Sequence, residues 1–145
     1  MPFPCARFLL GALCLTGAVG CGGETLVKLQ GRVVVGGEPL QWTEPTPLTV
    51  GLTGVSPDPE KTGKAFTAEV QKDGTFVVES SPGKGIPAGK YTFTVRSVGG
   101  APGTRPPAFL APFVDSDKTP LKYEVTTDAE QKIVIDLTKQ NVQRE

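Results

Sequence analysis

Apolar and polar residues alternate along short stretches of the chain. In LVKLQGRVVV (26–35), every second residue from Val27 onward is apolar or glycine, whereas Lys28, Gln30 and Arg32 between them are polar. Such a two-residue period is typical of a strand with one buried face. Further short stretches of strand character lie at 48–53, 65–70, 75–80, 90–98, 121–126 and 132–137. No stretch keeps a helical period beyond a turn or two, so the pattern predicts seven β-strands and no long helix.

Turn-forming residues separate these stretches. The sequence GGEPL (36–40) ends the first of them. Asp73-Gly74 stands between 65–70 and 75–80 and is the strongest hairpin signal in the chain. We therefore expect these two strands to pair with each other.

The number and spacing of the strands predict the fold class. Seven short strands in a chain of 145 residues, with 18 glycines and 14 prolines, fit one all-β domain. We expect residues 26–138 to form a single seven-stranded antiparallel Greek-key β-sandwich. Residues 139–145 lack an apolar pattern, and we expect them to form a flexible tail.

One long connection, residues 99–120, interrupts the regular spacing. It contains five prolines and is longer than most loops in compact domains. It is either a functional loop or a proline-stiffened crossover whose apolar side chains cover an open end of the sandwich. We favour the crossover because large apolar side chains seldom point at water without a partner. The covering residues would be Phe109, Leu110, Phe113 and Val114.

The first twenty residues have the pattern of an export signal. Arg7 and the amino terminus are positive, and residues 8–19 form a twelve-residue apolar stretch. A helix needs about 20 apolar residues to cross a bilayer, so this stretch is too short to be a membrane span. The sequence predicts a signal peptide over residues 1–20.

Cys21 follows the small residues Ala18, Val19 and Gly20. This stretch resembles the lipobox of bacterial lipoproteins. The resemblance implies cleavage before Cys21, a diacylglycerol on its sulfur, and acylation of the new amino terminus. Residues 21–25 would then be the lipidated cysteine and a spacer. The alternatives are ordinary signal cleavage that leaves a bare thiol, or an uncleaved interior cysteine.

Three segments resemble a known family of sandwich domains. The segments LQGRVVVGGEPL (29–40), DGTFVVE (73–79) and GIPAGKYTFTV (85–95) are similar to the prealbumin-like modules called carboxypeptidase regulatory-like or Cna-B-like domains. The segment 112–137 resembles the end of a group of short, uncharacterised bacterial envelope lipoproteins built on that module. These resemblances cover most of residues 26–138 and concern architecture more than activity.

Within this resemblance, Pro87, Gly89 and Tyr91 have the spacing of a structural corner. Proline fixes one φ angle, and glycine permits a turn that other residues resist. In Greek-key sandwiches a tyrosine in this position bonds back to the backbone with its hydroxyl. We expect Tyr91 to have this structural role.

Charge and composition exclude several functions. Fifteen basic residues balance fifteen acidic residues, so no charge excess indicates nucleic acid as a partner. The chain contains no histidine, which excludes Ser-His-Asp and Cys-His catalysis and histidine-based metal sites. Prealbumin-like enzymes that hydrolyse a purine-derived ring, and sandwich dioxygenases with Tyr and His iron ligands, need such residues.

Some Cna-B-like modules form a Lys-Asn isopeptide bond between their first and last strands. Here alternation places Lys28 and Asp136 on the outward face, and Asn141, the only asparagine, lies in the expected tail. We therefore expect no such bond.

Two weaker candidate binding sites remain. Asp115 and Asp117 are carboxylates two residues apart, as are Asp58 and Glu60, but calcium needs six or more oxygen ligands. We interpret them as solvated turn residues. Trp42, the sole tryptophan, is either a sugar-stacking platform or a cover over the edge of the sandwich, and we favour the cover.

These observations favour a non-enzymatic lipoprotein of the bacterial cell envelope that acts as a structural or protein-interaction module. It would be exported and held at a membrane through lipid on Cys21. Envelope proteins or polysaccharide would be its partners, and we expect no cofactor, metal or nucleic acid. The alternative is a module that binds a small ligand, carbohydrate or calcium, through Trp42 and the connection 99–120.

Overall fold

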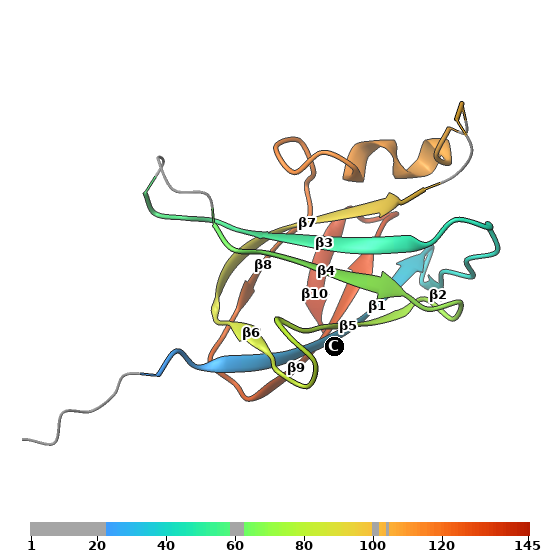
Figure 1. Ribbon diagram of the computed structural model, residues 1–145. Helices are drawn as coiled ribbons and strands as arrows, with labels where there is room; N and C mark the ends of the chain where they lie inside the picture. Colours follow the sequence, from blue (N-terminus) through green and yellow to red (C-terminus); the bar gives the residue numbers. More distant parts are fainter. Residues whose placement is uncertain (1–22, 59–62, 100–101, 104) are drawn as a thin grey trace, which may run out of the picture.

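The computed structural model describes residues 23–58, 63–99, 102–103 and 105–145, which form two β-sheets around a shared core (Figure 1). The six-stranded sheet contains β1 (Leu26–Val35), β2 (Glu38–Pro39), β5 (Thr75–Val78), β6 (Ile86–Pro87), β9 (Glu130–Asp136) and β10 (Asn141–Arg144). The four-stranded sheet contains β3 (Leu48–Gly54), β4 (Ala65–Val70), β7 (Gly89–Ser97) and β8 (Lys122–Val125). The expected all-β architecture of two sheets is confirmed.

The strand β1 is the centre of the six-stranded sheet. One of its edges pairs with β9 in parallel over Lys28–Val34. Its other edge pairs in turn with β6, β5 and β2, all antiparallel. The four-stranded sheet has the order β4-β3-β7-β8, and all its pairs are antiparallel.

The expectation of an entirely antiparallel sandwich of seven strands is wrong in two respects. A strand lies in each of the seven expected ranges, but β2, β6 and β10 are additional. The pair β1–β9 is parallel because the chain leaves β8 and enters β9 at the end of the sandwich where β1 begins. A backbone bond of 2.9 Å from the Lys28 amide to the Ala129 carbonyl fixes that entry point.

The expected hairpin between β4 and β5 is also wrong, because these strands belong to different sheets. β4 pairs with β3, and β5 pairs with β1. The turn itself exists: the Gly74 amide donates to the Gln71 carbonyl at 2.9 Å, and Gly74 has a φ of 85°. The Gly74 carbonyl accepts from the Val33 amide at 2.8 Å, which ties the turn to β1. The turn therefore carries the chain from one sheet to the other.

The expected flexible tail is instead the edge strand β10. It pairs antiparallel with β9 from Asn141 to Arg144. The Glu145 carboxylate contacts the Arg32 guanidinium at 2.7 Å, and Val142 packs against the core. Backbone bonds to the open edge of β9 need no apolar pattern, so the periodicity of the sequence carried no signal for this strand.

The connection between β7 and β8 contains a short 3-10 helix, η1 (Ala108–Phe113), which packs beside β7. Leu110 and Phe113 are buried and Val114 is half-buried, so the expected apolar cover over the sandwich is confirmed for these residues. Phe109 does not join them, since 47% of its surface is exposed. The crossover thus has an inner apolar face on the core and an outer one in solvent.

Candidate functional site

The corner before β7 has the expected construction. The Tyr91 hydroxyl donates to the Pro87 carbonyl at 2.8 Å, and Gly89 between them has a φ of 154°. Pro87 lies in β6, where it pairs with Leu26 at the beginning of β1. The tyrosine therefore holds the chain where it passes from the six-stranded sheet to the four-stranded sheet.

The surroundings of Tyr91 keep its hydroxyl protonated. Burial raises the pKa of Tyr91, and the negative charge of Glu24 raises it further. Its ring lies 6.1 Å from the ring of Phe66, tilted by 60°. A hydroxyl that is neutral and bonded to the backbone positions a corner, and it offers no base for chemistry.

Trp42 is part of the core. Only 8% of its surface is exposed, and its Nε1 donates to the Thr46 carbonyl at 2.6 Å. The side chain borders a hollow of about 260 Å³ together with Glu44, Pro45 and Glu69. A sugar-stacking platform needs an exposed ring face, so this burial contradicts that role and agrees with the cover over the edge of the sandwich.

The paired acids of the crossover serve their own turn. Oδ1 of Asp115 accepts a bond of 2.9 Å from the Asp117 amide, and Lys118 Nζ lies 3.5 Å from Oδ2. The hydrogen bond from the Asp117 amide is the main cause that lowers the pKa of Asp115, and the contact with Lys118 lowers this pKa further. Among the described residues, no cluster of three or more acidic, histidine or cysteine side chains could hold a metal ion. The Asp58 amide donates to the Ser56 hydroxyl at 3.2 Å, and Glu60 lies outside the described residues.

The residues tested for an isopeptide bond lie apart. Lys28 pairs with Glu130 at one end of the β1–β9 ladder, and Asp136 pairs with Val34 at the other. Six residues of strand separate them, roughly 20 Å. Lys28 is exposed as expected, but Asp136 is buried, contrary to the alternation. The turn after β9 covers Asp136, because the amides of Thr138 and Lys139 both donate to its Oδ1 at 3.0 Å.

A polar network closes the side of the sandwich between β8 and β9, and the sequence analysis missed it. The buried amide of Gln131 donates to the Thr126 carbonyl and hydroxyl, both at 2.8 Å, and accepts from the Tyr123 hydroxyl at 3.2 Å. Asp128 accepts from Thr126 at 3.0 Å and from Arg144 at 2.8 Å. Each of these donors has an acceptor within the fold, so the network stabilises the turn before β9.

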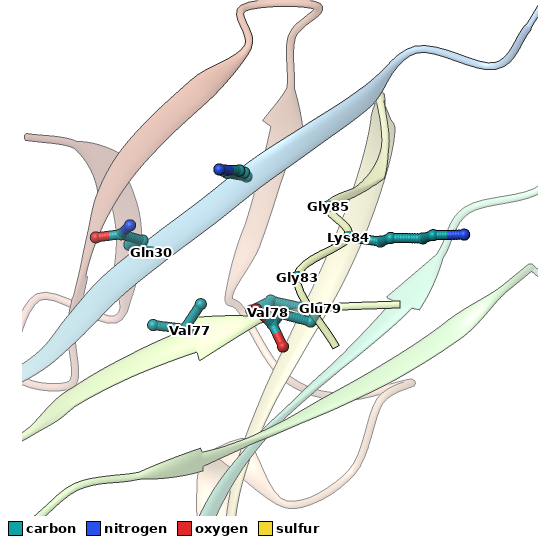
Figure 2. Close-up of a pocket in the computed structure, with 8 residues that line it drawn as sticks. Gln30, Val77, Val78, Glu79, Gly83, Lys84 and Gly85 are labelled. Atoms are coloured by element: carbon teal, nitrogen blue, oxygen red, sulfur yellow. The ribbon is translucent and has the colours of Figure 1, made fainter. Parts of the chain in front are cut away.

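A shallow hollow of about 160 Å³ lies where β1 and β5 meet the glycine-rich loop at 83–85. Figure 2 shows Gln30 and Val77 on its neighbouring strands and the Lys84 side chain extending away from them. Glu79 is the acid among the lining residues, and no second acid joins it. This arrangement of mixed, outward side chains has no assembled acid, base and nucleophile.

The proposed anchor, Cys21, and the cleavage motif of Ala18, Val19 and Gly20 lie outside the described residues. The described part of the chain begins at Gly23. Within the expected spacer, Glu24, the third residue after Cys21, already contacts the domain. Lys64 Nζ contacts both Glu24 carboxylate oxygens, at 2.8 and 3.0 Å. Among the residues that the structure describes, no helix has the length and hydropathy to cross a bilayer.

Comparison with known proteins gives little more. No protein-family model matches the chain, and no curated protein matches it. One solved structure similar to it is the crystal structure of (S)-allantoin synthase, with a TM-score of 0.41 and 17% sequence identity. The match covers 84% of this chain and 45% of that one, so this chain spans less than half of that protein.

Proposed function

We propose that the protein is a non-enzymatic lipoprotein of the bacterial cell envelope, anchored in a membrane through Cys21, that acts as a protein-interaction module. The proposal joins two features at different places on the molecule. The apolar stretch 8–19 and the small residues before Cys21 support export and lipidation. The described domain supports interaction with a partner rather than catalysis.

The outer face of η1 is the observation that carries the interaction. Residues 106–114 (PPAFLAPFV) contain no polar side chain. Leu110 and Phe113 enter the core, whereas Phe109, Ala111 and Pro112 are exposed. Exposed apolar side chains that gather in one place favour binding of a protein surface. A proline within the helix and another before it also limit the conformational freedom that would be lost on binding.

Three of the described side chains with chemistry suited to catalysis or calcium binding are engaged within the fold, which favours a binding function. The Tyr91 hydroxyl bonds to backbone, Asp115 bonds to its own turn, and Asp128 bonds to Arg144. The burial of Trp42 and the local bonding of Asp115 also weigh against the alternative, a carbohydrate or calcium binder. We further propose that the domain is related to the prealbumin-like modules, which the two-sheet architecture and the tyrosine corner support.

Membrane fractionation tests the anchor. We expect Cys21→Ser to abolish incorporation of a labelled fatty acid and to move the protein out of the membrane fraction. Retention of the variant in membranes without label would contradict anchoring through this residue.

Site-specific crosslinking tests the interaction. A photoreactive phenylalanine analogue at Phe109 is expected to give a discrete crosslinked product in intact cells. The same analogue at Val77, an exposed apolar residue of β5, is the control. Equal crosslinking at both positions, or none at Phe109, would refute binding through η1.

A further inference from the structure

Very little chain separates Cys21 from the folded domain. Three residue steps lead from Cys21 to Glu24, and they span at most roughly 11 Å when fully extended. Glu24 is held by Lys64, and Leu26 two residues later pairs with Pro87. A lipid on Cys21 would therefore keep this part of the domain close to the membrane surface. The tether is about as long as the spacing between two packed β-sheets, which is about 10 Å.

The same end of the sandwich contains four more segments. The Val55 amide donates to the Lys90 carbonyl at 2.8 Å, and the Gly54 amide donates to the Lys64 carbonyl at 2.8 Å. Lys90 stands at the beginning of β7, opposite Glu124 of β8. In Figure 1 this end lies on the left, where the blue start of the chain emerges, and η1 lies far from it at the upper right. We call the surface of Glu24, Leu26, Val55, Lys64 and Lys90 the anchor end.

Apolar side chains on the anchor end are exposed. Val55 is 57% exposed and Leu26 is 41% exposed, although both side chains are apolar. Beside Val55 lies a hollow of about 360 Å³ bordered by Tyr123, Lys90 and Lys122. An apolar surface with lysines at its margin matches the boundary between lipid headgroups and acyl chains, where lysine stems lie along apolar surface and the amines stay in the polar layer.

We propose that the anchor end rests on the lipid bilayer, with Val55 and Leu26 at the boundary between headgroups and acyl chains. This inference rests on the proposed lipidation of Cys21. The bilayer is the occupant because a tether of about 11 Å leaves no room for a folded partner between this end and the membrane. Lys64 and Lys90 are balanced by Glu24 and Glu124, so net charge contributes little to membrane binding. The short tether instead favours binding because it gives this end a high effective concentration at the membrane.

The orientation has a consequence for η1. β7 begins with Gly89 at the anchor end, and η1 packs beside β7 in the direction of its far end. The nine residues of β7 span roughly 30 Å at the rise of a strand. With the anchor end on the bilayer, Phe109 is held away from lipid, where a protein partner can reach it.

Fluorescence quenching in membranes tests this orientation. In the full, lipidated protein Cys21 carries lipid, and Cys5 and Cys14 leave with the signal peptide, so one introduced cysteine is the single free thiol. Val55→Cys places a fluorophore on the anchor end. Val98→Cys is the matched control, because Val98 is 47% exposed and its amide bonds to the Pro47 carbonyl at the other end of β7.

A quencher attached to lipid is expected to quench the label at 55 at least threefold more than the label at 98. Equal quenching in membrane-bound protein, or stronger quenching at 98, would overturn the orientation while leaving the anchor intact. Loss of both variants from the membrane fraction would instead refute the proposed lipidation, and the inference with it.

A longer tether separates contact with lipid from mere proximity. Insertion of about 20 glycine and serine residues between Gly22 and Gly23 gives a flexible tether. Such a tether no longer holds the domain close to the membrane by its short length. If Val55 and Leu26 contact the bilayer themselves, the label at 55 stays at least twofold more quenched than the label at 98. Equal quenching with the longer tether would refute that contact.

Discussion

Removal of the Tyr91 hydroxyl tests the corner that joins the two sheets. Tyr91→Phe keeps the ring against Phe66 and deletes only the bond of 2.8 Å to the Pro87 carbonyl. A typical hydrogen bond contributes about 1 kcal/mol, and a buried acceptor left without a donor costs about 1 to 3 kcal/mol. We therefore expect the free energy of unfolding to fall by about 1 to 3 kcal/mol, or about 4 °C in Tm for each kcal/mol.

Trp42 provides the assay, because it is the only tryptophan and is buried in the folded protein. Urea unfolding followed by its fluorescence at pH 7 gives the free energy difference between variants. The pH dependence gives a second readout. Burial, and then Glu24, raises the pKa of Tyr91 above its ordinary value of 10.0. The folded state then holds this proton more tightly than the unfolded state.

It follows that the contribution of Tyr91 is fully present below about pH 10 and is lost as pH rises through its folded pKa. Tyr91→Phe should remove this part of the alkaline loss of stability. Tyr123→Phe is the control, because Tyr123 is only half-buried and its hydroxyl makes a longer bond of 3.2 Å to Gln131. A cost for Tyr91→Phe no larger than that of the control would show that the corner does not depend on this bond.

Three further changes test the packing and the polar network. Gly31→Ala should cost about 1 to 3 kcal/mol in urea unfolding, because its Cβ would lie 2.5 Å from Phe76 Cζ, and adding Phe76→Leu should recover part of that loss. Deletion of residues 141–145 should lower stability by about 2 kcal/mol and speed hydrogen exchange in β9, whose outer edge it exposes. The bonds from Thr126 and then Arg144 lower the pKa of Asp128, so its contribution is present above about pH 4 and is lost as pH falls. Asp128→Asn should therefore narrow the difference in stability between pH 7 and pH 3, and an unchanged difference would contradict this assignment.

The features that the sequence predicted depend on local chemistry. Alternation located β1 because one face of that strand lies on the core, from Val27 to Val33. The corner at Tyr91 was predictable because proline, glycine and tyrosine act within a few residues of one another. The buried inner face of η1 was predictable because apolar side chains such as Leu110 need a partner.

The features that the sequence did not predict depend on partners distant in the chain. Asp73-Gly74 specifies a turn, but the bond between Val33 and Gly74 decides which sheet the next strand joins. Burial of Asp136 depends on amides in the following turn, which a two-residue period does not describe. The polar network around Gln131 needs the return of β10 to bring Arg144 beside Asp128.

The position of β1 suits the strand that would follow a lipid anchor. Under the proposed function, Cys21 lies on the membrane side of β1 and a partner holds η1, so a pull between them acts along this strand. Seven residues of β1 pair with β9 and four pair with β5 on the opposite edge. Ladder hydrogen bonds lie across the strand direction, so such a pull shears many of them together. Force applied through an edge strand such as β10 would instead break its bonds to β9 one after another, because only one side of β10 is paired. The attachment point at the beginning of β1 therefore places the tension on the strand with the most neighbours in its sheet.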